Sequence, residues 1–145
     1  MNKHEVAGAA DDISGSMSKS QYKTAREDIS DQYKTDRTAC KAMVGNAKHV
    51  CSEEAKGRKR IAEAELRANY SPSDKHRQDL STARIEAAHS VARETCESLS
   101  GNARDVCRNE AKGAYLVAKA DVKLAQQTVN AAARRDAKRV RRDAV

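Results

Sequence analysis

Large aromatic side chains and proline are scarce in this sequence. Its 145 residues include four Tyr, one Pro, and neither Phe nor Trp. A compact core built from so few large side chains would be thin. No segment approaches the ~18 consecutive apolar residues of a membrane span, and none sustains the alternation of Val, Ile and Thr that marks strands. The composition therefore argues against a globular α/β domain and against a membrane-spanning protein.

Motifs of known chemistry are also missing from the chain. It contains no phosphate-binding Gly-rich loop, no Gly-x-Ser-x-Gly, no His-Glu-x-x-His and no EF-hand loop. The four histidines are dispersed and form no i,i+4 pair. We expect no catalytic residue, no cofactor and no metal site, and we interpret the protein as non-enzymatic.

Alanine and charged residues are what the chain has in abundance. Charged residues make up 34% of the sequence, and alanine is frequent. This composition is typical of long, exposed helices that pack along Ala-rich seams. The predicted fold class is all-α.

The chain is a tandem repeat with a period of 56 residues. Within residues 40–57 and 96–113, ten of the eighteen aligned positions are identical. A fixed period of this kind indicates one supersecondary unit that is used twice. Weaker matches upstream extend the repeat toward the N-terminus.

Each repeat reads as two helices that meet at a turn. Glycine followed by asparagine marks the turns, because glycine favours the end of one helix and asparagine can cap the next. These turn residues are Gly45 and Asn46 in the first repeat, and Gly101 and Asn102 in the second. The second repeat is expected to begin with Ser71 as N-cap and Pro72 at the first helical position.

Four parts of the chain follow from this pattern. They are a flexible leader (1–17), a first helical hairpin (18–70), a second hairpin (71–130) and a basic helical tail (131–145). We expect the four long helices to form either an antiparallel bundle or an elongated pair of hairpins.

The four cysteines lie at symmetric distances from the two turns. Cys40 is five residues before Gly45, and Cys51 is five residues after Asn46. On one unbroken helix these cysteines would be ~16 Å apart, but across a hairpin they face each other. Cys96 and Cys107 repeat the arrangement. We predict two disulfides, Cys40–Cys51 and Cys96–Cys107, each closing the tip of a hairpin.

Two other uses of the cysteines remain open from the sequence. They could be unpaired core residues of a cytosolic protein. They could also form a zinc site, alone or with His49, although zinc ligands usually come in pairs two to four residues apart. Disulfides would indicate an oxidising compartment. The first residues lack the apolar region of a signal peptide, so an exported protein would have lost its signal.

A family resemblance rests on the doubled motif Cys-x4-Gly-Asn-Ala-x3-Cys. Over roughly residues 18–125, the chain resembles small exported proteins of Gram-negative bacteria that are commonly labelled cell envelope biogenesis protein TolA or TolA-like. The four cysteines and both Gly-Asn pairs match the family motif, whereas His49 replaces the acidic residue that Asp105 keeps. The resemblance implies a periplasmic or otherwise exported location and indicates no mechanism.

Positive charge is concentrated at the C-terminus. Residues 131–145 carry +4 of the chain's net charge of +7. The candidate anion-binding residues are Arg134, Arg135, Lys138, Arg139, Arg141 and Arg142. They would suit phospholipid headgroups, anionic polysaccharide or, less well without aromatic neighbours, nucleic acid.

These observations give one leading hypothesis and two alternatives. The leading one is a structural or interaction protein of the envelope, with an unknown protein or envelope partner and a basic end that contacts anionic surfaces. The first alternative is a metal- or stress-related binding protein that uses reduced cysteines and histidines. The second is a cytosolic nucleic-acid-binding helical protein. A homodimer is also expected, because narrow apolar seams are often completed by a second copy.

Overall fold

Four helices make up almost all of residues 17–144, the part of the chain that the computed structural model describes. They are α2 (Lys19–Lys41), α3 (Gly45–Tyr70), α4 (Asp74–Cys96) and α5 (Gly101–Asp143). No strand occurs among these described residues. The all-α prediction is confirmed. The predicted leader lies outside the described residues except for Met17.

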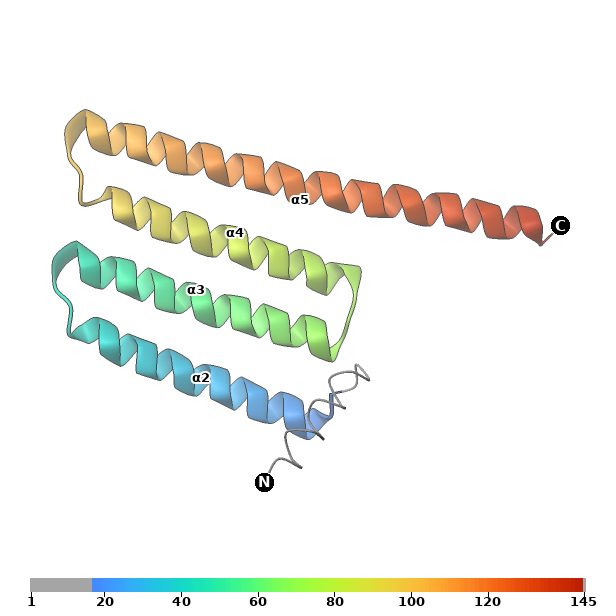
Figure 1. Ribbon diagram of the computed structural model, residues 1–145, viewed down its shortest axis with the longest axis horizontal. Coiled ribbons are helices and arrows are strands. Elements are labelled where there is room, and N and C mark those ends of the chain that lie inside the picture. The colour runs from blue at the N-terminus through green and yellow to red at the C-terminus, as the bar shows by residue number, and fades with distance from the viewer. Residues whose placement is uncertain (1–16, 145) are drawn as a thin grey trace, which may run out of the picture.

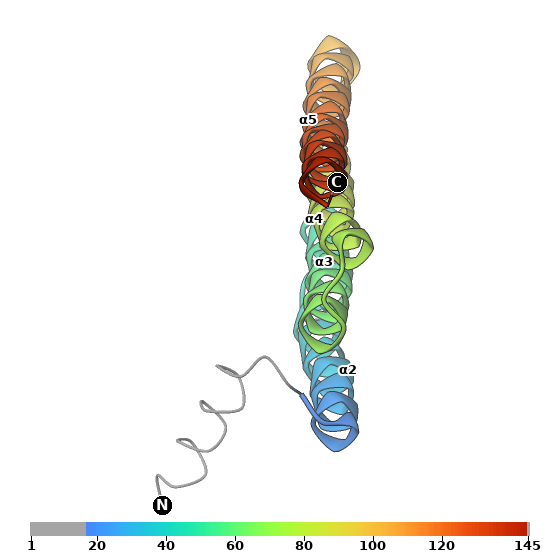
Figure 2. The ribbon, with the colours of Figure 1, turned by 90° about the vertical axis from the view of Figure 1, so that its right-hand side faces the viewer.

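The helices stand side by side and antiparallel in a single layer (Figure 1). Each helix contacts only the helices next to it in the chain, so α2 and α5 form the two edges. Seen from the side, the four helices stack in one column (Figure 2). The two hairpins are thus joined along α3 and α4, and no closed bundle forms.

Small side chains line the seams between the helices. Apart from the cysteines and Leu66, the buried apolar residues are alanines: Ala55, Ala64, Ala83, Ala87 and Ala111. A Cβ built at Gly57 would lie only 2.9 Å from the Cβ of Ala87, so α3 and α4 approach closely at this point. A layer one helix thick offers only narrow strips for burial. Small residues along these strips allow the helix backbones to approach closely, so that the strips are well packed.

Serine side chains cap the first turn of two of the helices. Ser18 and Gln21 form a reciprocal capping box at the start of α2, with bonds of 2.9 and 3.0 Å. At the start of α4 the cap is Ser73, whose hydroxyl accepts a bond from the His76 amide at 3.0 Å. The prediction of Ser71 as the cap is therefore wrong. A helix beginning at Pro72 would leave one residue to span the 8–10 Å that typically separates neighbouring helix axes.

Glycines with left-handed backbone make the two hairpin turns. Gly45 has φ 62° and Gly101 has φ 58°, in a backbone region that residues other than glycine rarely adopt. Each glycine is the first residue of its helix, after a short loop. The expectation that asparagine caps the next helix is wrong, because Asn46 and Asn102 already lie within α3 and α5, and Val44 and Ser100 hold the cap positions.

The last helix is much longer than its neighbour. At ~1.5 Å per residue, the 43 residues of α5 extend ~65 Å, against ~35 Å for the 23 residues of α4. The start of α4 lies beside Val129, where both helices line one groove. Beyond it α5 continues without a neighbour (Figure 1). Residues 130–143, called the projecting segment below, include most of the predicted helical tail.

Candidate functional site

All six candidate anion-binding residues lie on the projecting segment. From Ala133 to Ala144 every side chain is exposed. The segment carries six cations, and pairs of them are three, four or seven residues apart: Arg134, Arg135, Lys138, Arg139, Arg141 and Arg142. On an α-helix such spacings place all six on one side, within an arc of ~160°. The structure therefore gathers these cations into one exposed basic face.

The opposite side of the projecting segment is only weakly apolar. It carries Ala133, Ala137 and Val140 beside Asp136 and Asp143, and Val140 is 68% exposed. No aromatic or leucine side chain is present in residues 130–143. Deep insertion into a lipid bilayer requires such large apolar side chains. The segment is therefore suited to electrostatic contact with a surface.

The two predicted disulfides are present. Cα atoms are 5.5 Å apart in Cys40–Cys51 and 5.6 Å apart in Cys96–Cys107, within the usual range. Each bond joins the two helices of a hairpin close to its turn. Both turns lie at the end of the layer opposite the projecting segment of α5 (Figure 1). With all four sulfurs bonded, this oxidised state offers no thiolate to a metal.

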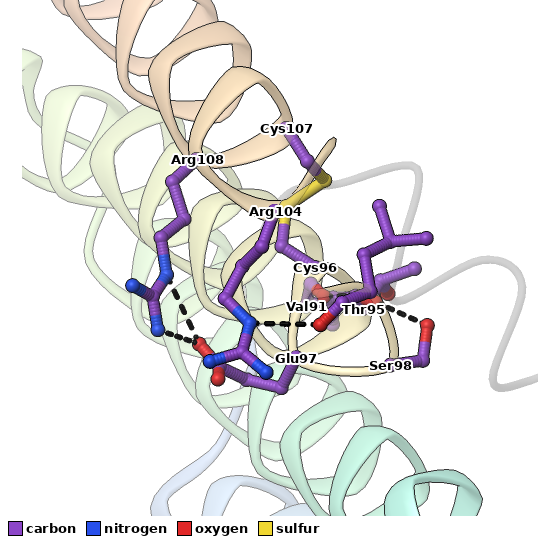
Figure 3. Close-up of a disulfide and its surroundings, with 9 residues drawn as sticks. Val91, Thr95, Cys96, Glu97, Ser98, Arg104, Cys107 and Arg108 are labelled. Atoms are coloured by element: carbon purple, nitrogen blue, oxygen red, sulfur yellow. Dashed lines mark hydrogen bonds and ion pairs between the residues drawn. A yellow bond between two sulfur atoms is a disulfide. The ribbon is translucent and has the colours of Figure 1, made fainter. Parts of the chain in front are cut away.

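Polar contacts surround the second disulfide (Figure 3). Arg108 Nη2 donates to Glu97 Oε1 at 2.6 Å, and Arg104 Nε donates to the Leu99 carbonyl at 2.8 Å. The hydrogen bond from Arg108, supported by its positive charge, lowers the pKa of Glu97. Sequence reasoning missed this pair, although each member directly follows a paired cysteine. The first repeat has Lys41 and Ser52 at the equivalent positions and lacks the ion pair.

Each seam of the layer carries one ion pair between helices. Arg58 of α3 contacts Asp36 of α2 at 3.3 Å, and Arg84 of α4 contacts Glu65 of α3 at 3.3 Å. The third is the Arg108–Glu97 pair between α5 and α4. A hydrogen bond from Gln32 and the contact with Arg58 lower the pKa of Asp36. These charged groups lie at half-exposed seams and pair with each other between helices. We therefore assign them a structural role.

Both hairpins have a contact to a tyrosine ring at equivalent positions. The tyrosine lies on the first helix of the first hairpin and on the second helix of the second hairpin. In the first, Lys59 Nζ of α3 lies 4.8 Å from the centre of the Tyr33 ring of α2. The equivalents in the second are His89 of α4 and Tyr115 of α5, whose stacked rings are 4.1 Å apart. Tyr115 also donates a hydrogen bond to Glu86 at 2.7 Å. The tyrosines therefore serve packing between helices.

Two shallow grooves also occupy equivalent positions in the two hairpins. The first, of about 450 Å³, lies between α2 and α3 and includes the charged residues Asp28, Asp36, Arg58 and Lys59. The second, of about 410 Å³, lies between α4 and α5 and is lined largely by Ala88, Ala92, Ala114 and Ala118. Both are open to solvent. Neither groove is enclosed in the manner of most ligand pockets.

Neither a metal-binding cluster nor a membrane-spanning helix occurs among residues 17–144. No three His, Cys, Asp or Glu side chains are grouped there so that they could hold a metal ion. None of the four described helices combines the length and apolar character needed to cross a membrane.

Comparison with known proteins identified no relative: no protein-family model, curated protein or solved structure matches this chain.

Proposed function

We propose that the protein is a non-enzymatic interaction protein of an oxidising, exported compartment, and that its projecting segment binds anionic surfaces. The observation that carries this proposal is the exposed basic face, whose six cations lie on a helical segment that no other described helix covers. The disulfide-closed hairpins support the location, because such bonds persist mainly outside the reducing cytosol. The TolA-like resemblance of the doubled cysteine motif favours the bacterial cell envelope within that range.

Binding through this face would be mainly electrostatic. A cation near an anionic membrane surface contributes about 1 kcal/mol, and the effect decays within a Debye length of roughly 10 Å in dilute salt. Six cations on one side of a helix can approach the same surface together. Because the opposite side has no large anchor, attachment should be reversible and strongly weakened by salt.

Co-sedimentation with lipid vesicles tests the proposal. The protein should bind vesicles rich in phosphatidylglycerol at low salt and bind them less at high salt. It should not bind vesicles of pure phosphatidylcholine. Replacing the six cations of the projecting segment by Gln should remove most of the binding.

A matched control exists in α2. That helix also has six exposed cations: Lys19, Lys23, Arg26, Lys34, Arg37 and Lys41. Their replacement by Gln changes the net charge equally and should leave most binding intact. Equal losses of vesicle binding in both variants would show that binding depends only on the overall charge of the protein. That result would overturn the proposed site. Preferential binding to duplex DNA over vesicles, lost in the same tail variant, would favour the nucleic-acid alternative.

A further inference from the structure

The outer edge of α5 carries an apolar strip without a neighbour. Its members recur at three-, four- and seven-residue spacings, which places them on one side of the helix: Val106, Gly113, Val117, Ala120 and Leu124. Val117 and Leu124 are 63% and 62% exposed. The strip faces away from α4, since Ala111, Tyr115 and Ala118 line the seam on the other side.

The internal repeat shows what this kind of strip does elsewhere in the molecule. The equivalent residues of α3, 56 positions earlier, are Val50, Gly57, Ile61, Ala64 and Ala68. That strip includes the closest approach to α4, at Gly57 and Ala87, and all five residues are buried or half-buried. The α5 strip is thus a second copy of a helix-packing surface, in which Leu124 replaces Ala68 and Val117 replaces Ile61.

Gly113 strengthens the comparison. A glycine inside a helix costs about 1 kcal/mol relative to alanine. At Gly57 the cost has a structural reason, because a Cβ would meet Ala87. At Gly113 a Cβ would have no atom within 4 Å beyond the adjacent backbone of its own helix. Within the single chain nothing explains this glycine, whereas a closely packed second helix would.

We propose that two copies of the chain associate through the outer edges of α5, antiparallel about a two-fold axis perpendicular to the layer. The axis would pass near Tyr115 along the helix, so that Gly113 of each copy faces the partner's Val117 and Val106 faces the partner's Leu124. The valine fills the space that glycine leaves open. The product is a continuous eight-helix layer with α2 at both outer edges.

The opposite edge of the layer excludes a head-to-tail alternative. The α2 residues equivalent to the buried Ala83 and Ala87 are Glu27 and Asp31, and both are exposed. Docking α2 of another copy onto α5 in the manner of α4 would bury Asp31 against Gly113 and place Asp28 beside Asp121, where α3 and α4 have the Arg84–Glu65 ion pair. Burial of an unpaired carboxylate is strongly unfavourable. The strip therefore selects a second α5, which gives a closed dimer and no open chain.

The two-fold arrangement leaves both basic ends free. With the axis near residue 115, Gly101 of one copy lies opposite residue 129 of the other. Each projecting segment then extends beyond the first turn of the partner's α5. The dimer does not depend on what the basic face binds.

Sedimentation equilibrium of the full chain tests the dimer. The wild type should be a dimer at micromolar concentration. Val117→Glu should weaken the dimer by at least about a hundredfold, which corresponds to ~2.8 kcal/mol at 1.4 kcal/mol per tenfold. Val140→Glu is the matched control, because Val140 lies on the same helix, is 68% exposed and lies outside the strip; this variant should dimerise normally.

Circular dichroism should show equal helix content in both variants, since both positions are exposed. A monomeric wild type across the concentration range would overturn the proposal. Equal dimerisation of the two variants would also overturn it, by placing the contact on another surface. So would assemblies that grow with concentration beyond two copies.

Discussion

At the scale of single residues, equivalent glycines in the two repeats have opposite surroundings. Gly57 faces Ala87 across the central seam, and Gly113 faces open space in the single chain. Both occupy helix interiors, where alanine is intrinsically preferred. The same substitution should therefore change stability in opposite directions at the two sites.

Gly57→Ala should destabilise the chain. The new Cβ would lie 2.9 Å from another Cβ, and neither atom can rotate away from its backbone. Overpacking typically costs 1–3 kcal/mol, which exceeds the gain of about 1 kcal/mol in helix propensity. The midpoint of urea denaturation should fall.

Gly113→Ala should stabilise the monomer by up to ~1 kcal/mol, because only the propensity gain applies. The measurement belongs at a protein concentration low enough to dissociate any dimer. A loss of stability in that dilute sample would show that the Gly113 environment is not open in the monomer.

At the scale of helices and hairpins, each disulfide closes a short loop at a tip. The enclosed loop of about a dozen residues corresponds to ~2–3 kcal/mol of stabilisation through the unfolded state. Replacing both cysteines of one hairpin by Ser should lower stability by roughly that amount, as judged by chemical denaturation. The two hairpins differ around their disulfides, so the two double variants need not be equal.

The second tip should tolerate loss of its disulfide better than the first. Glu97 and Arg108 still join α4 to α5 there, whereas Lys41 and Ser52 supply no ion pair at the first tip. Cys96→Ser with Cys107→Ser should therefore leave its tip more protected from hydrogen exchange than Cys40→Ser with Cys51→Ser leaves the first. The reverse order of protection would contradict a role for the ion pair.

The same pair predicts a pH dependence. The folded-state pKa of Glu97 is lowered, so its contribution to stability is present above the ordinary glutamate pKa of about 4.3. It is lost as the pH falls below that value and through the lower folded-state pKa. Glu97→Gln should flatten the acid side of a stability–pH curve, with little change in slope at neutral pH. An unchanged acid limb would show that the pair is not formed in solution.

The sequence predicted features at the scale of helices and hairpins better than it predicted the arrangement of the helices. The helices, the Cys40–Cys51 and Cys96–Cys107 bonds and the helical tail could be predicted, because periodicity and symmetric spacing are local signals. The choice of Ser73 over Ser71 as a cap depended on the distance between α3 and α4. Both serines fit the local capping pattern, so the chain gave no means of choosing between them.

At the scale of the whole molecule, the single layer was not predicted. Alanine-lined helices suit a bundle and a layer equally well, and a sequence does not state how many neighbours a helix has. The strip on α5 could have been found by aligning it with α3, but its exposure became visible only with the layer. The candidate basic face was predicted residue by residue; its extension beyond α4 was not.

The period of 56 residues gives the layer a property that closed folds lack. Because each helix meets only its neighbours in the chain, an extra copy of residues 46–101 inserted after Gly101 would add one hairpin and disturb no distant contact. Cys96 would then pair with the inserted Cys51, and the inserted Cys96 with Cys107. Duplication within the gene could thus widen the molecule in steps of one hairpin while both edges, the charged outer side of α2 and the apolar outer side of α5, stay the same.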